Sequence, residues 1–75
     1  MIKVEVRLFA YLRQGRGKKQ ILEFEEGTTI SQVMDMLNID EDDVSIALIN
    51  GTDGPIDRLL KDGDVLALFP PVGGG

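Results

Sequence analysis

The stretch that decides the fold is Val65-Leu66-Ala67-Leu68-Phe69-Pro70-Pro71-Val72-Gly73-Gly74-Gly75. Its apolar first half predicts a β-strand, and Pro70 ends that strand because proline cannot donate to a sheet ladder. The Pro70-Pro71 pair favours a stiff, extended exit, and the glycines that follow have no side chain to bury. We therefore expect a folded domain over residues 1–69 and a flexible, extended tail over residues 70–75 that ends in Gly-Gly.

The tail is expected to present a free carboxylate on a thread of nearly bare backbone. Six steps separate Phe69 from Gly75, so the extended thread reaches roughly 20 Å. A Cβ on either of the last two residues would block a channel that closes around a glycine backbone. These features predict that the tail delivers its own carboxyl group into the active site of another protein. A frayed terminus is the alternative.

Composition narrows the class of protein. Seventy-five residues suffice for one small domain, which buries only ~60% of the surface of its unfolded chain. The chain has no Cys and no His, which excludes disulfides, the usual zinc sites and the commonest catalytic base. A net charge of −5 and the absence of Trp argue against nucleic-acid binding. With no apolar run near ~20 residues and no signal peptide, we expect a cytoplasmic protein without a membrane segment.

The N-terminal half predicts two strands. Apolar and polar residues alternate over residues 2–8 with the period of two that a half-buried strand requires, and Phe9 is the one apolar exception on the polar face. A second strand is expected over residues 20–25, with Leu22 and Phe24 facing the core. The inward residues of the first strand are Ile2, Val4, Val6 and Leu8.

One amphipathic helix follows the two strands. Thr29 and Gln32 have the spacing of a capping box, which places the helix start at Thr29. Apolar residues then recur at i, i+3, i+4 and i+7, so one helical face turns toward a core. Asn38 suits the left-handed position at which a helix ends. The apolar stripe consists of Ile30, Val33, Met34 and Leu37.

The C-terminal half predicts the remaining strands. A third strand over residues 44–49 ends at Asn50-Gly51, a strong turn signal. A short strand within residues 52–56, a helical turn over residues 57–60 and a final strand over residues 64–69 follow. This order predicts an α+β fold in which a mixed sheet of four or five strands packs on one helix.

Two phenylalanines are expected on the outer face of that sheet. If Leu66 and Leu68 face the core, Phe69 faces outward, and the same count along the first strand places Phe9 outward. Should the two strands be neighbours, the phenylalanines form an exposed apolar patch, and such patches mark binding surfaces. The alternative is that each Phe covers a sheet edge within the domain.

Two charged segments invite a ligand-binding interpretation. The basic loop over residues 14–19 lacks the length and the Gly-Lys-Ser/Thr ending of a phosphate-binding P-loop. The acidic run over residues 40–43 lacks the alternating ligands and the glycine of a calcium loop. We interpret both as solvated loops, with partner contact open for the acidic run, and we expect no metal site.

Three segments resemble the MoaD/ThiS sulfur carriers, and the chain is most similar to the MoaD type, the small subunit of molybdopterin synthase. The most specific part is the Asp-Gly-Asp turn that precedes Phe-Pro-Pro-Val and the terminal Gly-Gly. Gly73 departs from the pattern, because alanine is common there. The segments are Phe9-Ala10-Tyr11-Leu12-Arg13, Asn50-Gly51, and Leu60-Lys61-Asp62-Gly63-Asp64-Val65 running into Phe69-Pro70-Pro71-Val72-Gly73-Gly74-Gly75.

The resemblance implies a ubiquitin-like β-grasp fold and a carrier that is not catalytic by itself. An E1-like adenylating enzyme would use ATP to activate the carboxylate of Gly75, and a sulfur donor would then convert it to a thiocarboxylate. The molybdopterin synthase large subunit would receive that sulfur for molybdenum cofactor synthesis. No cofactor is expected on the chain itself.

The resemblance also implies roles along the tail. Gly75 would carry the sulfur, and Gly74, Gly73 and Val72 would make up the thin thread. Pro71 and Pro70 would hold the exit extended, which lowers the entropy cost of threading. The partner-binding residues would be Phe9 and Phe69.

Three alternatives stay open. The acceptor of the sulfur could be the thiazole of thiamine, as for ThiS, or a tungsten pterin. The activated glycine could instead be passed to a lysine, as in a ubiquitin-like modifier. The chain could also be a β-grasp interaction module with an inert tail.

Overall fold

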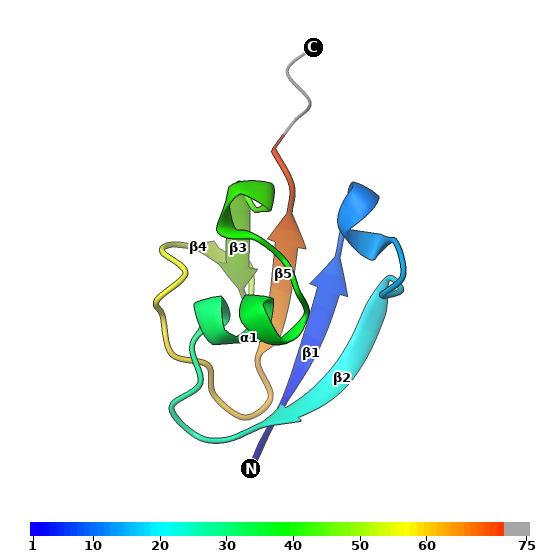
Figure 1. Cartoon of the computed structure of the whole chain (residues 1–75). Helices are drawn as coiled ribbons and strands as arrows, with labels where there is room; N and C mark the ends of the chain where they lie inside the picture. Colours follow the sequence, from blue (N-terminus) through cyan, green and yellow to red (C-terminus); the bar gives the residue numbers. More distant parts are fainter. Residues whose placement is uncertain (72–75) are drawn as a thin grey trace.

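The computed structural model describes residues 1–71, which form a five-stranded sheet with one α-helix across one face (Figure 1). The strands lie in the order β2-β1-β5-β3-β4. This architecture confirms the predicted α+β, β-grasp fold. The elements are β1 (Ile2–Leu8), the 3-10 helix η1 (Ala10–Arg13), β2 (Lys19–Phe24), α1 (Ile30–Met36), the 3-10 helix η2 (Glu41–Asp43), β3 (Ile46–Ile49), β4 (Thr52–Asp53) and β5 (Val65–Phe69).

The two central strands, β1 and β5, run parallel. Glu5 lies opposite Val65 and Leu8 lies opposite Leu68. The other pairings, β1 with β2, β3 with β5 and β3 with β4, are antiparallel, so the sheet is mixed as predicted. Because β1 and β5 are parallel, both finish at the same end of the sheet, and residues 70 and 71 leave the domain there (Figure 1).

The helix begins and ends where the sequence predicts. The backbone N–H of Gln32 donates to Thr29 Oγ1 over 3.3 Å, and the Thr29 N–H donates to Gln32 Oε1 over 2.9 Å. This reciprocal pair is the capping box, which satisfies two otherwise unpaired donors at the helix start. Asn38 has a φ of 58°, the left-handed conformation expected just past the helix end.

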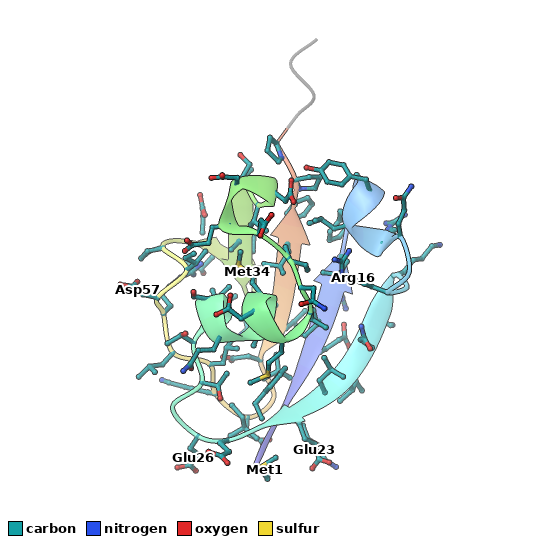
Figure 2. The ribbon with its side chains drawn as sticks, viewed as in Figure 1. Met1, Arg16, Glu23, Glu26, Met34 and Asp57 are labelled. Carbon is teal, nitrogen blue, oxygen red and sulfur yellow. The ribbon has the colours of Figure 1, made fainter. Side chains whose placement is uncertain are left out.

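The core lies between α1 and the sheet face that it covers. Met34 extends from α1 into this core (Figure 2), and Leu66 of β5 is 0% exposed. Fully burying one such side chain stabilises the fold by about 1.5–3 kcal/mol. The inward assignments of the first strand, the helix stripe and the last strand are confirmed. The fully buried side chains are Leu8, Ile30, Met34, Leu66, Leu68, Val4, Val6 and Val33.

The basic loop is anchored by one of its arginines. Arg16 Nε donates to the Leu37 carbonyl and an Arg16 terminal nitrogen donates to the Asn38 carbonyl, each over 3.0 Å. These carbonyls lie at the C-terminal end of α1, where a cation is favourable because of the helix dipole. The prediction of a wholly solvated loop was therefore wrong at Arg16 (Figure 2), which is half-buried.

Residues 57–60 do not form the predicted helical turn. The segment crosses beside the start of α1, and its carbonyls and amides bond to that region instead of to each other. Ile30 N donates to Arg58 O over 3.2 Å, Leu60 N donates to Thr28 O over 2.9 Å, and Leu59 forms an isolated bridge with Thr29. The third strand starts at Ile46 and not at Val44 as predicted, because Val44 caps η2 and its N–H donates to Glu41 O over 3.1 Å.

Candidate functional site

The outward phenylalanines meet at the point where β1 and β5 finish. The Phe9 and Phe69 rings stack with centroids 4.1 Å apart and an interplanar angle of 11°. Backbone bonds fix both residues, since Phe9 N donates to Leu68 O over 3.2 Å and Ser45 N donates to Phe69 O over 2.8 Å. Both belong to interior strands or their ends, so the interpretation that each covers a separate sheet edge was wrong.

A short 3-10 helix supports Phe9 from the other side. Ala10, with a φ of 55°, turns the chain sharply into η1. Arg13 of η1 then lies over the Phe9 ring, with its guanidinium carbon 5.4 Å from the centroid, and its Nε donates to Leu8 O over 2.8 Å. The Phe9 ring is thus held between a cation and a second aromatic ring, so its position is well defined.

An apolar groove opens beside the stacked pair. Its volume is about 430 Å³, and the first residues of the tail form part of its wall. The groove brings four predicted site residues together: Phe9, Phe69, Pro70 and Pro71. The other predicted site residues, Val72, Gly73, Gly74 and Gly75, lie outside the described residues. The remaining lining residues are Ala10, Tyr11, Ser45 and Ile46.

None of these four lining residues was predicted as part of a site, and Ile46 and Tyr11 have the largest side chains among them. Ile46 lies opposite Phe69 in the β3–β5 register, so it shares the outer face, and 42% of its surface is exposed. Its position in the alternation of the third strand, opposite in phase to buried Ala47, was the signal available. Tyr11 offered no comparable signal, because its contacts depend on a turn that the sequence pattern did not predict.

A hydrogen bond links the two 3-10 helices that flank the exit of the chain (Figure 1). Tyr11 of η1 donates its hydroxyl to Asp43 Oδ1 of η2 over 3.2 Å. Partial desolvation, this hydrogen bond and the negative charge of Asp43 raise the pKa of Tyr11 above its ordinary value. The acidic run is therefore not a wholly solvated loop, because Asp43 holds one wall of the groove.

The apolar surface continues from the groove along the outer sheet face. Leu48 of β3 lies opposite Ala67 of β5, two residues along each strand from the Ile46–Phe69 pair and therefore on the same face. These half-buried or exposed residues are on the face that α1 leaves uncovered. We call the groove and these positions the outer patch, which consists of Phe9, Ala10, Tyr11, Ser45, Ile46, Leu48, Ala67, Phe69, Pro70 and Pro71.

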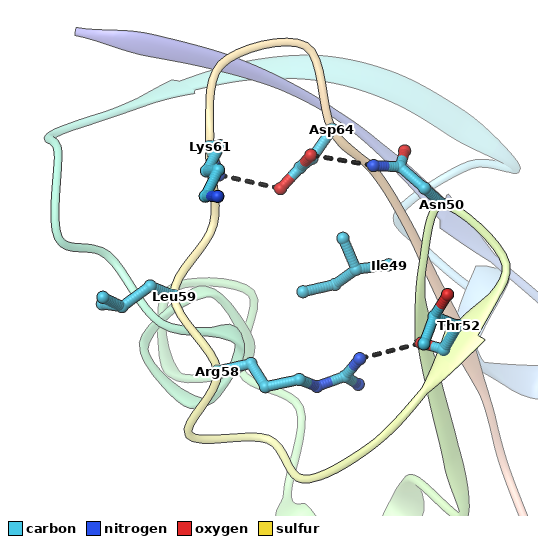
Figure 3. A pocket seen from close by; sticks show the side chains of 7 residues that line it. All are labelled: Ile49, Asn50, Thr52, Arg58, Leu59, Lys61 and Asp64. Carbon is cyan, nitrogen blue, oxygen red and sulfur yellow. Dashed lines mark hydrogen bonds between the residues drawn. The ribbon is translucent and has the colours of Figure 1, made fainter.

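A second cavity, of about 420 Å³, has a structural explanation (Figure 3). Arg58 donates to the carbonyls of residues 47, 52, 54 and 55, so its guanidinium joins β3 and β4 to the segment that follows β4. Asp64 accepts from Asn50 Nδ2 and from Lys61 N, over 2.9 and 2.8 Å, which joins two turns. Both charged groups serve the fold, so this cavity is a weaker candidate than the outer patch.

Across residues 1–71, His, Cys, Asp and Glu side chains form no group of three that could hold a metal ion. Over the same residues, no helix is both long enough and apolar enough to cross a bilayer. What the site can do is bind: it presents a rigid apolar surface where the chain leaves the domain.

The chain is similar to a known protein family and to several solved structures. A model of the ThiS family matches residues 6–75. No curated protein matches the chain by sequence. Among solved structures, the chain is similar to a Pyrococcus furiosus protein named as molybdopterin converting factor subunit 1. The two are 32% identical, with a TM-score of 0.79 and coverage of 96% of this chain and 100% of the other.

Two further structures share the fold. One is a chain in the complex of subunits 1 and 2 of molybdopterin-converting factor from Helicobacter pylori, 26% identical, with a TM-score of 0.66 and coverage of 99% and 100%. The other is small archaeal modifier protein 1 of Haloferax volcanii, with a TM-score of 0.79 and coverage of 96% and 100%. At 24% identity, this second likeness speaks for the fold alone.

Proposed function

From the premise that the chain belongs to the ThiS family of small sulfur carriers and modifiers, we propose that it is the sulfur-carrying small subunit of a molybdopterin synthase. The observation that supports this proposal is the apolar groove beside the stacked Phe9 and Phe69 rings, at the point where the tail begins. The 32% identity to the Pyrococcus furiosus protein supports the pterin client over the thiazole client.

The reactive group in this proposal is the carboxylate of Gly75. A C-terminal carboxyl has a reference pKa of ~3.5, so it is ionised at neutral pH and is a poor electrophile. An E1-like enzyme transfers AMP from ATP onto one carboxylate oxygen and releases pyrophosphate. A donor of sulfide-level sulfur then attacks the acyl carbon and displaces AMP, which leaves a thiocarboxylate on Gly75.

The tail residues shape how that group is delivered. Gly74 and Gly73 keep the thread thin, and Val72 follows the stiff Pro70-Pro71 exit. Two prolines reduce the conformations available to the free tail, so less entropy is lost when the tail enters a channel. The large subunit then supplies the acid, the base and the pterin site, while this chain supplies sulfur.

The outer patch is the docking surface in this proposal. Stacked aromatic rings with exposed apolar neighbours are typical of interface centres, where a few anchors carry most of the binding free energy. The similar Helicobacter pylori chain, solved in complex with subunit 2 of molybdopterin-converting factor, supports a partner of this kind.

Assays of sulfur transfer to each possible acceptor test the proposal directly. The thiocarboxylated chain, mixed with a large subunit and the precursor pterin, should yield one dithiolene per two carriers consumed. Sulfur transfer to a thiazole precursor instead would assign the ThiS-type role. Denaturation-resistant adducts on protein lysines would assign the role of a ubiquitin-like modifier.

A further inference from the structure

Charged residues of opposite sign are segregated along this chain. No acidic residue lies between Glu5 and Glu23, and no basic residue lies between Lys19 and Arg58. The first segment contains η1 and its connection to β2, whereas the second contains η2. In the fold, these two 3-10 helices stand on opposite sides of the point where β5 ends (Figure 1). The tail therefore leaves the domain between a basic flank and an acidic flank.

The basic flank has a cavity of its own, of about 340 Å³, lined by Arg7, Leu8, Phe9, Arg13, Lys18 and Lys19. Phe9 also lines the apolar groove, so the two cavities share one wall. Arg7 pairs with Glu5, and it is the one side-chain ion pair within residues 1–71. Lys18 and Lys19 are exposed, and no carboxylate of the described chain neutralises them.

The carboxylates of the acidic flank also lack cationic partners within the described residues. Glu41 and Asp42 of η2 are exposed, and neither forms an ion pair within the described part of the chain. The chain continues from η2 through Val44 to Ser45 and Ile46, which line the apolar groove. Asp43 is held by the Tyr11 hydroxyl, so η2 has a fixed position beside the exit.

On the basis of the proposed function, we propose that a protein which receives this tail has a binding surface with three parts, which are complementary to the basic flank, the acidic flank and the apolar groove. Carboxylates on the partner lie opposite Lys18 and Lys19, cations lie opposite Glu41 and Asp42, and apolar side chains enter the groove between them. Apolar contact has no preferred direction, whereas charge complementarity fixes the register of an interface. The two flanks thus set the rotation of the carrier on its partner, and the tail enters the channel from one direction.

Charge-reversal variants test this assignment. The probes are the E1-like adenylating enzyme and the molybdopterin synthase large subunit encoded in the same genome. Their dissociation constants for the whole chain are measured at 0.05 and 0.5 M salt, conditions that span a large change in screening. Lys18→Glu with Lys19→Glu should weaken binding about tenfold at low salt, and Glu41→Lys with Asp42→Lys should do the same.

Matched controls separate position from net charge. Lys3→Glu with Lys61→Glu and Glu25→Lys with Glu26→Lys make the same charge changes at the opposite end of the sheet. Both controls should bind within about twofold of wild type once net charge is screened. A four-residue swap, which combines the two flank reversals, keeps the net charge at −5. The swap should bind at least as weakly as either flank variant, and circular dichroism should show an intact fold.

The outcomes are distinct. If the swap binds both probes as tightly as wild type at low salt, the charged flanks do not direct docking and this inference is wrong, while the proposed function stands. If wild type binds neither probe, both fail. The isolated chain can also be titrated with ATP and followed by NMR. If the backbone amide chemical shifts of Lys18 and Lys19 change while the swap keeps its affinity for the protein probes, the basic cavity is a nucleotide site instead.

Discussion

At the scale of the residue, the site depends on how a few side chains are held beside the chain exit. Phe9 is held between the Phe69 ring and the Arg13 guanidinium, and Tyr11 reaches across to Asp43. Each contact joins segments that are distant in sequence. The sequence pattern placed Phe9 and Phe69 on one face, but it could not place Tyr11, whose position follows from the left-handed turn at Ala10.

The single tyrosine of the chain makes its environment measurable. With one Tyr and no Trp, the near-ultraviolet absorbance of tyrosinate reports Tyr11 alone. Its titration midpoint should lie above ~10, because desolvation, the hydrogen bond and the charge of Asp43 all oppose ionisation. The stabilisation from this contact is therefore complete below the unfolded-state pKa and is lost as pH rises through the folded-state pKa.

Asp43→Asn is the matched variant for that titration. The amide can still accept the hydroxyl hydrogen bond but has no charge, so the midpoint should fall toward ~10. Asp57→Asn, a distant exposed carboxylate, should leave it unchanged. Equal midpoints in wild type and Asp43→Asn would show that the Tyr11–Asp43 contact does not persist in solution.

Phe69→Ala should separate docking from folding. The stacked ring contributes about 0.5–1.5 kcal/mol beyond its buried area, and Phe69 is half-buried, so urea unfolding should show a loss of about 1–2 kcal/mol. Affinity for the activating enzyme should fall at least tenfold, as for a central interface anchor. Ile21→Ala, on the same face but at the sheet edge, is the control and should retain affinity.

At the scale of the element, most of the fold was predictable because local signals and hydrophobic period agreed. The capping box at Thr29, the left-handed Asn38 and the Asn50-Gly51 turn, with φ values of 51° and 84°, all have local causes. Residues 57–60 were not predictable in this way. Their backbone bonds go to the start of α1, a partner that no local pattern specifies.

Thr29→Ala should show what the capping box contributes. The variant loses the side-chain acceptor for Gln32 N, and the free energy of unfolding should drop by about 1 kcal/mol. Thr29→Ser retains the hydroxyl and should stay close to wild type in the same urea titration. A Thr29→Ala variant as stable as wild type would mean that solvent satisfies the helix start equally well.

At the scale of the whole molecule, the parallel pairing of β1 and β5 is what assembles the site. It brings Phe9 and Phe69, sixty positions apart in the chain, to one end of the sheet beside the exit. The order of strands was predictable in outline, but the β2-β1-β5-β3-β4 neighbour relations are a property of the complete sheet. The tail residues 72–75, on which the proposed chemistry depends, remain a prediction from sequence.

Deleting Gly74-Gly75 should separate binding from delivery of sulfur. The deletion leaves the outer patch intact, so affinity for the activating enzyme should change by less than about threefold. Sulfur transfer should fall to the level of a reaction without carrier, because the shortened chain ends at Gly73 and its carboxyl group stops two residues short of the partner's active site. Retained transfer by the shortened chain would indicate that the tail is inert and that this protein is a docking module.

The central claim is that the terminal carboxyl of Gly75 is the group that becomes activated and carries sulfur. Intact mass spectrometry after incubation with ATP, the activating enzyme and a sulfide donor tests it most directly. The account predicts a mass gain equal to the replacement of one oxygen by sulfur, located on the C-terminal peptide and absent when ATP is omitted. An unchanged mass with an enzyme that activates a known family member, or a gain on an internal peptide, would contradict it.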